Sequence, residues 1–435
     1  MIHLILAMGL ASQAPLPAPE PTGPHLSLRA ALDRALALSP SALRADDEIE
    51  AAEAQRIATK SLVLPRINVT GSLIKNSEEV TFGSASDSRT ILPGNDWNAR
   101  VTLQQPIYAG RREFRLYSQS KEGITLARDA KRGARDRIAL RVIADYAAAV
   151  QAEALMSVES QAAALANKRI AQAQALFDAG EVTKVDVLRA ETAHKAALRR
   201  VASAEADAIQ ARSRLRMTLA IDGRDTELGA LDGTTEIGLP VMGPETLEAR
   251  AVDRSEVKQA ETNVRIADLE VLKQKGAYLP VVTADLAYIR QKSSFPSDAY
   301  GYAALRFIVP VFQGGEVGAR VRIAAARLHQ AEVTLAETRR QATEDVRQAL
   351  ALLEAARRTK TLADDQVKAA EAEYAQAHDL YEQREATALD LEAAESALSE
   401  ARRALIQGRL AVLQAEASAW LAAGSLADAA LENFK

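Results

Sequence analysis

The chain is a tandem duplication, and this repeat restricts its possible folds more than any other feature of the sequence. The segment Pro106–Gly110 recurs as Pro310–Gly314, which offsets the two copies by 204 residues. The same offset aligns Glu191 with Glu395, so no insertion separates these landmarks in either copy. Internal repetition of this kind indicates two copies of one structural unit.

An earlier landmark shows where the two copies differ in length. Pro65 recurs as Pro280, an offset of 215 residues, so the first copy has 11 extra residues before Pro106. We expect these extra residues in the polar stretch 76–96, because surface loops tolerate insertions.

The composition favours long helices over a bulky globular core. The chain of 435 residues is 48% hydrophobic, largely through Ala and Leu, whereas only 4% of its residues are aromatic. Its net charge of −4 argues against a nucleic-acid-binding surface. The absence of cysteine excludes disulfides, thiolate metal sites, cysteine nucleophiles and a lipid-modified N-terminal cysteine.

Residues 1–25 have features of a signal peptide followed by a proline-rich lead-in. The apolar run Ile2–Leu10 precedes small residues that end at Ala14 and resemble a cleavage site, although no basic residue precedes the run. Elsewhere no apolar stretch approaches the ~20 residues that a membrane-spanning helix needs. If the chain spans a membrane, it must therefore do so with strands.

Each copy is expected to read as helix, strand, strand, long helix and returning helix. The first repeat, 26–220, has an expected helix at about 41–62, strands at about 65–75 and 97–107, a long helix at about 110–177 and a returning helix at about 184–219. The second repeat, 246–425, has expected strands at about 280–290 and 300–311, a long helix at about 315–381 and a returning helix at about 387–423. Residues 221–245 are expected to join the repeats, and 426–435 to form a C-terminal tail.

The strand segments alternate between apolar and polar residues over roughly ten positions, which is the pattern of barrel strands. Alternating strands also occur in half-buried soluble sheets. Here, however, only helices flank each pair, so a soluble sheet would have exposed edges. Four strands cannot close a barrel, whose minimum is about eight, and strands from several chains must therefore join. An interfacial aromatic girdle is expected from Trp97, Tyr288, Tyr300 and Tyr302.

The long helices each lack proline and would span about 100 Å at 1.5 Å per residue. Helices of this length need a partner along their whole length, and leucines and valines at coiled-coil spacings provide a contact face. A structural coiled-coil protein without a channel would explain these helices. It would leave the strand pairs and the duplication unexplained.

Two motifs, each present in both repeats, give the sequence a resemblance to the TolC family of outer-membrane channels over about residues 26–425. One motif is a strand-to-helix switch, in which proline ends strand pairing and glycine allows a sharp turn. Its residues are Pro106 and Gly110 in the first repeat and Pro310, Gly314 and Gly315 in the second. The other is the hairpin tip, 177–188 and 381–391.

The resemblance implies a homotrimer, with a twelve-strand barrel in the outer membrane and a twelve-helix tunnel in the periplasm. It also implies a passive exit duct for a tripartite efflux or type I secretion system, which works with a periplasmic adaptor protein and an inner-membrane pump. No cofactor is implied. In such channels the hairpin tips form the periplasmic gate, and the residues at the matching positions are Asp186, Tyr381, Arg384 and Asp390.

The resemblance assigns further roles to the tips. Asp186 and Tyr381 match a pair that links neighbouring coiled coils, and Asp390 matches an acidic ring at the constriction. The adaptor is expected to contact Gly180, Glu181, Val182, Thr183, Arg384, Glu385, Ala386 and Thr387. The sequence departs from the family at Ala386, where a basic gating residue is common, and at Ala393, where a second acidic ring can occur.

Helix capping explains part of the same motif without any gating role. Gly180 fits a left-handed helix end, Thr183 fits a helix N-cap, and an aspartate in the first turn is favoured by the helix dipole. The five histidines are far apart, and no nucleophile, base and orienting group come together, so we expect no enzyme. A periplasmic adaptor protein remains an alternative, but it would need a lipoyl-type β-domain that the sequence does not contain.

Overall fold

The structure is a computed structural model that describes residues 26–83, 89–221, 228, 230–231, 243–293, 297–383 and 385–433. The expected signal peptide and lead-in at 1–25 lie outside the described residues, as does most of the expected joining segment at 221–245.

The described part of the first repeat contains four main helices and four strands. In chain order these are α1 (Leu28–Leu38), α2 (Pro40–Lys60), the short 3-10 helix η1 (Ser61–Val63), β1 (Arg66–Lys75), β2 (Val80–Phe82), β3 (Arg89–Leu92), β4 (Asn95–Ala109), α3 (Arg112–Asp178) and α4 (Lys184–Thr218).

The second repeat follows the same order with two strands. It consists of α5 (Pro244–Ala251), α6 (Ser255–Lys275), η2 (Gly276–Tyr278), β5 (Val281–Gln291), β6 (Ala299–Ile308), α7 (Glu316–Glu382), α8 (Ala388–Ala422) and α9 (Leu426–Asn433). The long helices α3 and α7 have 67 residues each, and α4 and α8 have 35 residues each. The equal lengths show that the duplication holds in three dimensions through to the end of both hairpins.

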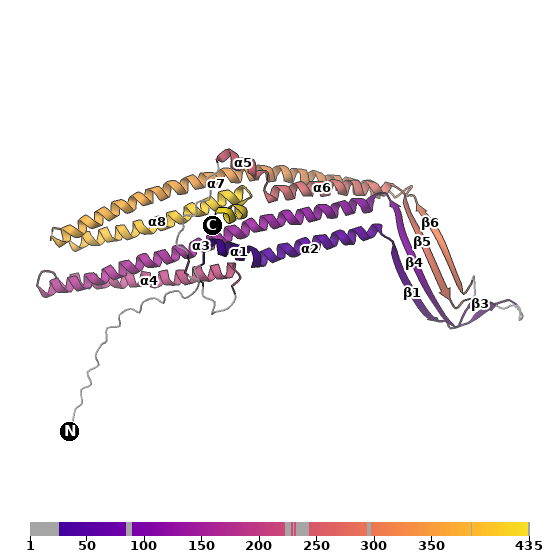
Figure 1. Cartoon of the computed structure of the whole chain (residues 1–435), viewed down its shortest axis with the longest axis horizontal. Coiled ribbons are helices and arrows are strands. Elements are labelled where there is room, and N and C mark those ends of the chain that lie inside the picture. The colour runs from indigo at the N-terminus through magenta and orange to yellow at the C-terminus, as the bar shows by residue number, and fades with distance from the viewer. Residues whose placement is uncertain are drawn as a thin grey trace, which may run out of the picture.

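The molecule is a long rod with the sheet at one end and two helical hairpins at the other (Figure 1). The helices α3 and α7 run the full length of the helical part. Beside their sheet-proximal halves lie α2 and α6, and beside their distal halves lie α4 and α8. The hairpins α3–α4 and α7–α8 contact each other through α3 and α8. No described helix has a segment that is both long enough and apolar enough to cross a membrane.

The four long strands form one antiparallel sheet in the order β1-β4-β5-β6. The pairing registers place the alternating apolar residues of all four strands on one face. For example, Val69 pairs with Val101, which pairs with Tyr288, which pairs with Gly301. Most large side chains on this face are exposed in the single chain, among them Ile67, Val69, Leu73, Val101, Leu286, Tyr288, Leu305 and Phe307.

The same registers correct the expected aromatic girdle. Tyr288 pairs with Gly301, so the neighbouring residues Tyr300 and Tyr302 point to the opposite, polar face. Trp97 and Tyr288 remain on the apolar face. A girdle facing outward can therefore include only these two of the four aromatics.

The strand-to-helix switches differ between the repeats. In the first, β4 continues through Pro106 to Ala109, with a register shift between Pro106 and Tyr108. In the second, β6 ends at Ile308, so the strand expected at 300–311 is shorter and Pro310 follows it. Gly110 and Gly314 both have left-handed backbones, at φ values of 64° and 56°.

Among the described elements, α1, the strands β2 and β3, and α9 were not expected from the sequence. The helix α1 precedes the expected first helix, and the strands β2 and β3 form a small hairpin within the insertion of the first repeat. The expected C-terminal tail is instead the helix α9, whose Leu426 and Ala430 are fully buried. Both α1 and α9 pack into the largest hydrophobic core, at mid-length of the rod against α3.

Candidate functional site: the hairpin tips and the contact between the hairpins

The first hairpin tip joins α3 to α4 through a tight turn. Gly180, at a φ value of 77°, ends α3, and its backbone N–H donates to the carbonyl oxygen of Phe177 at 2.9 Å. Thr183 begins α4 with a capping box: its backbone N–H and its hydroxyl both donate to Asp186 Oδ2, at 3.0 and 2.8 Å. Arg189 lies 3.6 Å from the Asp186 carboxylate.

The second tip has the same capping geometry, formed by Thr387 and Asp390. The backbone N–H and hydroxyl of Thr387 donate to Asp390 Oδ2 at 2.9 and 2.6 Å, and the Asp390 N–H donates back to the hydroxyl. Glu385 and Ala386 close the turn through backbone bonds to the carbonyl oxygen of Leu380. Arg384 lies outside the described residues.

Both tip aspartates are held as carboxylates. Hydrogen bonds from Thr183 lower the pKa of Asp186, and hydrogen bonds from Thr387 lower the pKa of Asp390. A pKa that is lower in the folded chain means that folding favours the charged form. The capping contribution is therefore present at neutral pH and is lost as the pH falls through the lowered pKa.

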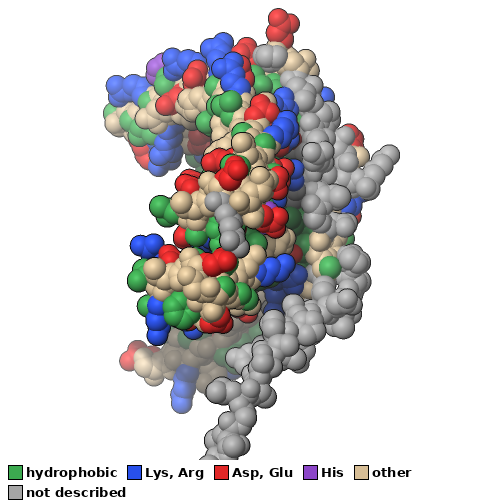
Figure 2. All heavy atoms as spheres, turned by 90° about the vertical axis from the view of Figure 1, so that its left-hand side faces the viewer, with side chains coloured by type: hydrophobic (Ala, Val, Ile, Leu, Met, Phe, Trp, Pro, Cys, Tyr) green, Lys and Arg blue, Asp and Glu red, His purple; other side chains and the backbone are tan. Residues whose placement is uncertain are grey.

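The tips present most of their expected contact residues to solvent. Gly180, Glu181, Thr183, Glu385 and Thr387 are exposed, whereas Val182, Ala386 and Tyr381 are partly buried. The two tips lie at the same end of the molecule (Figure 1). From that end, acidic and basic side chains are intermingled with apolar ones (Figure 2).

Ion pairs between the two hairpins form a further cluster, which the sequence did not reveal. The carboxylate of Glu159 on α3 accepts from Arg200 on α4 at 2.9 Å and from Arg403 on α8 at 2.7 Å. Arg169 on α3 pairs with Glu395 on α8. Burial raises the pKa of Glu395, and the charge of Arg169 acts against this rise.

Each hairpin has an ion pair between its two helices at the same pair of positions in the repeat. The acidic and basic residues have changed places between the two hairpins. Glu153 accepts from Arg212 at 2.5 Å in the first hairpin, and Glu416 accepts from Arg357 at 2.8 Å in the second. The offset of 204 residues maps each member of one pair onto a member of the other. Residues that correspond in sequence therefore make corresponding contacts in the structure.

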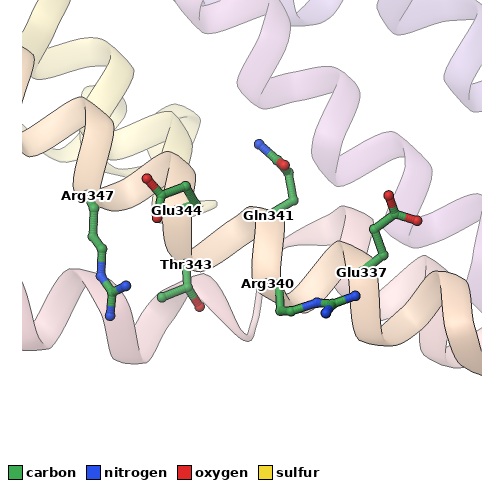
Figure 3. Close-up of a pocket in the computed structure, with 6 residues that line it drawn as sticks. All are labelled: Glu337, Arg340, Gln341, Thr343, Glu344 and Arg347. Carbon is green, nitrogen blue, oxygen red and sulfur yellow. The ribbon is translucent and has the colours of Figure 1, made fainter.

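The described surface has a pocket on one of the long helices. A surface pocket of about 540 Å³ is lined only by residues of α7: Glu337, Arg340, Gln341, Thr343, Glu344 and Arg347. Their side chains point in different directions instead of meeting at one point (Figure 3). Among the described residues, no three His, Asp or Glu side chains gather in a way that could hold a metal ion.

The relatives found by comparison with known proteins are efflux or secretion proteins. The family of outer membrane efflux proteins matches residues 31–220 and 248–425. The outer membrane efflux protein BepC of Brucella suis is 22% identical over 298 residues, which cover 66% of this chain and 64% of BepC, less than two thirds of its length. The proteases secretion protein PrtF of Dickeya chrysanthemi is 24% identical over 342 residues, 70% of each chain.

The fold has a close counterpart among solved structures. The CusC structure matches with a TM-score of 0.77 over 95% of this chain and 98% of CusC, at 16% sequence identity. The expected mainly helical fold with a small sheet is thereby confirmed. Because the family match covers most of both repeats, the chain belongs to the outer membrane efflux proteins, the family of the TolC-like channels.

Proposed function

We propose that this chain is one of three identical subunits of an outer-membrane channel-tunnel, the passive exit duct of a tripartite efflux or secretion system. A periplasmic adaptor protein and an inner-membrane pump would complete the system, and the pump would supply the energy. The observation that carries this proposal is the sheet, whose apolar face is exposed and whose two edge strands have free edges.

The edges of the sheet support assembly with further copies. Among the described strands, β4 pairs on both sides, whereas β1 and β6 each pair on one side. The repeat makes β6 the counterpart of β4, and β1 the counterpart of β5. Pairing of β6 with β1 of a neighbouring copy would repeat the β4–β5 contact and continue the sheet. Three copies with four strands each would close a barrel with no free edge.

An exposed apolar stripe on α7 supports the same assembly in the helical part. Ile323, Val333, Leu352 and Leu362 are exposed, and their spacings of 10, 19 and 10 residues place them on one helix face. Gln119 of α3 is the counterpart of Ile323 in the first repeat. Its side-chain amide donates a hydrogen bond to a backbone carbonyl oxygen of α6 in the same chain. We infer that this face of α7 meets the corresponding helices, α2 and α4, of a neighbouring copy.

Replacing Val69 by arginine should prevent stable insertion of the sheet into the outer membrane. Val69 lies on the apolar face near the middle of β1, where an arginine facing lipid costs ~2–4 kcal/mol. The measurement is the amount of trimer in outer-membrane fractions and its thermal stability in detergent.

The matched control is Asn68→Arg. Asn68 is the preceding residue in β1 and lies on the polar face, which would line the water-filled interior. This variant should insert like the original chain. Equal insertion of the two variants would contradict a lipid-facing role for the apolar face.

We propose that the hairpin tips form the periplasmic entrance. Asp390 would contribute to a ring of three carboxylates, Asp186 and Tyr381 would link neighbouring hairpins, and Arg384 would belong to the same gate. The exposed tip residues Gly180–Thr183 and Glu385–Thr387 would contact the adaptor. Support comes from the position of both tips at the end of the rod opposite the sheet (Figure 1).

Substitution of Asp390 should change ion selectivity. A ring of carboxylates attracts cations and repels anions, so Asp390→Ala should raise the permeability of anions relative to cations severalfold. The Asp390 carboxylate also caps α8, so the variant Asp390→Asn should be measured alongside Asp390→Ala. In Asp390→Asn the amide oxygen can still accept hydrogen bonds, but the charge is gone. Reversal potentials of the reconstituted trimer across a salt gradient provide the measurement.

Glu432→Gln serves as the control, because it removes the charge of an exposed carboxylate on α9, away from the tips and from the proposed ring. It should leave the selectivity unchanged. An unaltered reversal potential in both Asp390 variants would show that this carboxylate does not line the pathway.

A further inference from the structure

Charged residues are divided unequally between the two faces of the sheet. The four long strands contain seven charged residues. Five of them, of both signs, lie on the polar face: Arg66, Asp96, Arg100, Asp285 and Arg306. The other two, Lys75 and Arg290, lie on the apolar face. Lys75 is two residues from Leu73 on the same side of β1, and Arg290 pairs with Ala99 of β4. In these strands, the apolar face therefore has basic residues but no carboxylate.

Lys75 and Arg290 occupy the same position in the two repeats. The offset of 215 residues that relates Pro65 to Pro280 also relates Lys75 to Arg290. Their partners correspond as well, because Lys75 pairs with Asn95 and Arg290 with Ala299, which are 204 residues apart. In the proposed trimer, on which this inference rests, two such side chains in each of three chains would alternate around the outside of the barrel at one level.

Both residues lie at the end of the sheet that is remote from the helices (Figure 1). Lys75 is the last residue of β1, and Arg290 is the residue before the last in β5. Eight residues separate Arg290 from Val282, which lies near the helices on the same face. At ~3.3 Å per residue and a strand tilt of about 40°, Arg290 is ~20 Å higher than Val282, close to the limit of an apolar band ~25 Å tall. The charged end of a long basic side chain at this level can reach the headgroup region.

The surroundings of Arg290 leave its guanidinium group accessible. Its neighbours on the adjacent strands are the small residues Ala99 and Ala299. Arg290 and Lys75 are both exposed, and in the described part of the chain neither side chain forms an ion pair. An anion from outside the chain can therefore approach both residues.

A further lysine and two aromatic residues lie close to Arg290. Tyr288 precedes Arg290 by two residues on the same face of β5. Lys292 follows it by two residues and is exposed, and its backbone N–H donates to the carbonyl oxygen of Trp97 at 3.0 Å. Tyrosine and tryptophan rings are enriched at the level where the lipid headgroups begin. The apolar face therefore ends in a zone with both aromatic and basic side chains.

We propose that Lys75, Arg290 and Lys292 bind the phosphate groups of lipid headgroups in the membrane leaflet that is remote from the helices. The basic residues are continuous with the apolar face, so the lipid whose chains cover that face also places its headgroup beside them. Their charge selects a headgroup with phosphates, and arginine donates to phosphate oxygens in a bidentate manner. At the end of the apolar face near the helices, the four long strands have no basic residue, so the site is confined to one leaflet.

Removal of the two charges related by the repeat tests the proposal. The probe is lipid A, a glycolipid with a phosphorylated headgroup, added to the purified trimer in detergent micelles. The variant with both Lys75→Gln and Arg290→Gln should bind lipid A about thirtyfold more weakly than the original chain. Lipid A from which the phosphates have been removed should bind the original chain as weakly. Native mass spectrometry of the trimer measures the amount of bound lipid.

The matched control is the variant with both Arg66→Gln and Arg100→Gln. It loses the same number of exposed basic residues, but from the polar face, and its affinity should stay within about twofold of the original. The variant with Lys75→Arg and Arg290→Lys keeps the charge and should bind within about threefold of the original.

Equal affinity of the original chain and the double glutamine variant would overturn the proposal. So would equal binding of the two forms of lipid A to the original chain, a comparison that requires no variant to fold. Displacement of lipid A by inorganic phosphate at the same concentration would indicate a site for the free ion and would also overturn it. An original chain that forms no trimer in membranes would instead contradict the proposed function, so the two failures are distinguishable.

Discussion

Replacing Gly110 by alanine should strongly reduce the amount of folded trimer. Gly110 lies between β4 and α3 with a left-handed backbone, which costs a residue with a Cβ ~1–2 kcal/mol. An added Cβ would also lie 2.9 Å from the carbonyl carbon of Gly276, and closer still to its oxygen. Backbone atoms cannot rotate away as a side chain can, and such overpacking costs a further ~1–3 kcal/mol.

The physical reason for this sensitivity is that the two repeats meet at Gly110 and Gly276. The switch from strand to helix in the first repeat touches the end of α6 in the second. A shift of this contact would disturb the β4–β5 pairing and the start of α3 together. Thermal unfolding followed by circular dichroism, and the yield of trimer in membranes, measure the effect.

Gly315→Ala provides the matched control in the second repeat. Gly315 also has a left-handed backbone, but beyond its two neighbours in the chain no atom lies within 4 Å of an added Cβ. Its counterpart in the first repeat is Arg111, which adopts the same conformation at a φ value of 61°. Gly315→Ala should therefore cost only the backbone contribution. Equal losses in the two variants would mean that the close approach of Gly110 to Gly276 is not important for stability.

Truncating Leu426 to alanine should destabilise the middle of the rod. Leu426 is fully buried at the start of α9, within the core that also contains residues of α1 and α3. Loss of a fully buried leucine side chain leaves a cavity and costs ~2–5 kcal/mol. We expect a lower thermal midpoint of the trimer in detergent and earlier cleavage at the C-terminal end by protease.

The position of α9 explains why a short terminal helix should matter. The backbone N–H of Ala427 donates to the buried Asp136 carboxylate of α3 at 2.8 Å. Detachment of α9 would expose an apolar core and leave this carboxylate without that partner. Glu432→Ala, which changes an exposed residue of the same helix, should have little effect. A thermal midpoint for Leu426→Ala equal to that of Glu432→Ala would contradict a structural role for α9.

The sequence predicted the features that depend on local periodicity. Alternating residues indicated the strands, and the pairing registers bring their apolar sides to one face, because successive side chains in a strand point to opposite faces. The tip signals, Gly180 with Thr183 and Asp186, indicated a helix end and a new helix start, and the structure contains both. Each of these signals lies within a few residues of the feature it predicts.

Features stabilised by distant contacts were missed. The helix α9 has eight residues, and helices this short are not stable without tertiary packing. Tyr300 and Tyr302 were assigned to a girdle by residue type alone, although their register with β5 decides which face they occupy. The ion pair of Glu159 with Arg403 joins residues 244 positions apart, and no local pattern indicates it.

The sequence by itself determined the duplication, the lengths of the long helices and the alternation of the strands. Each of these follows from the repeated spacing of residues along the chain. This spacing does not depend on what the helices pack against. The tertiary structure alone decided that α3 meets α8, and that Glu159 lies between two arginines. Because the two hairpins are nearly equivalent, their helices offer similar faces. Which of these faces pack together therefore depends on side chains that approach each other only after folding.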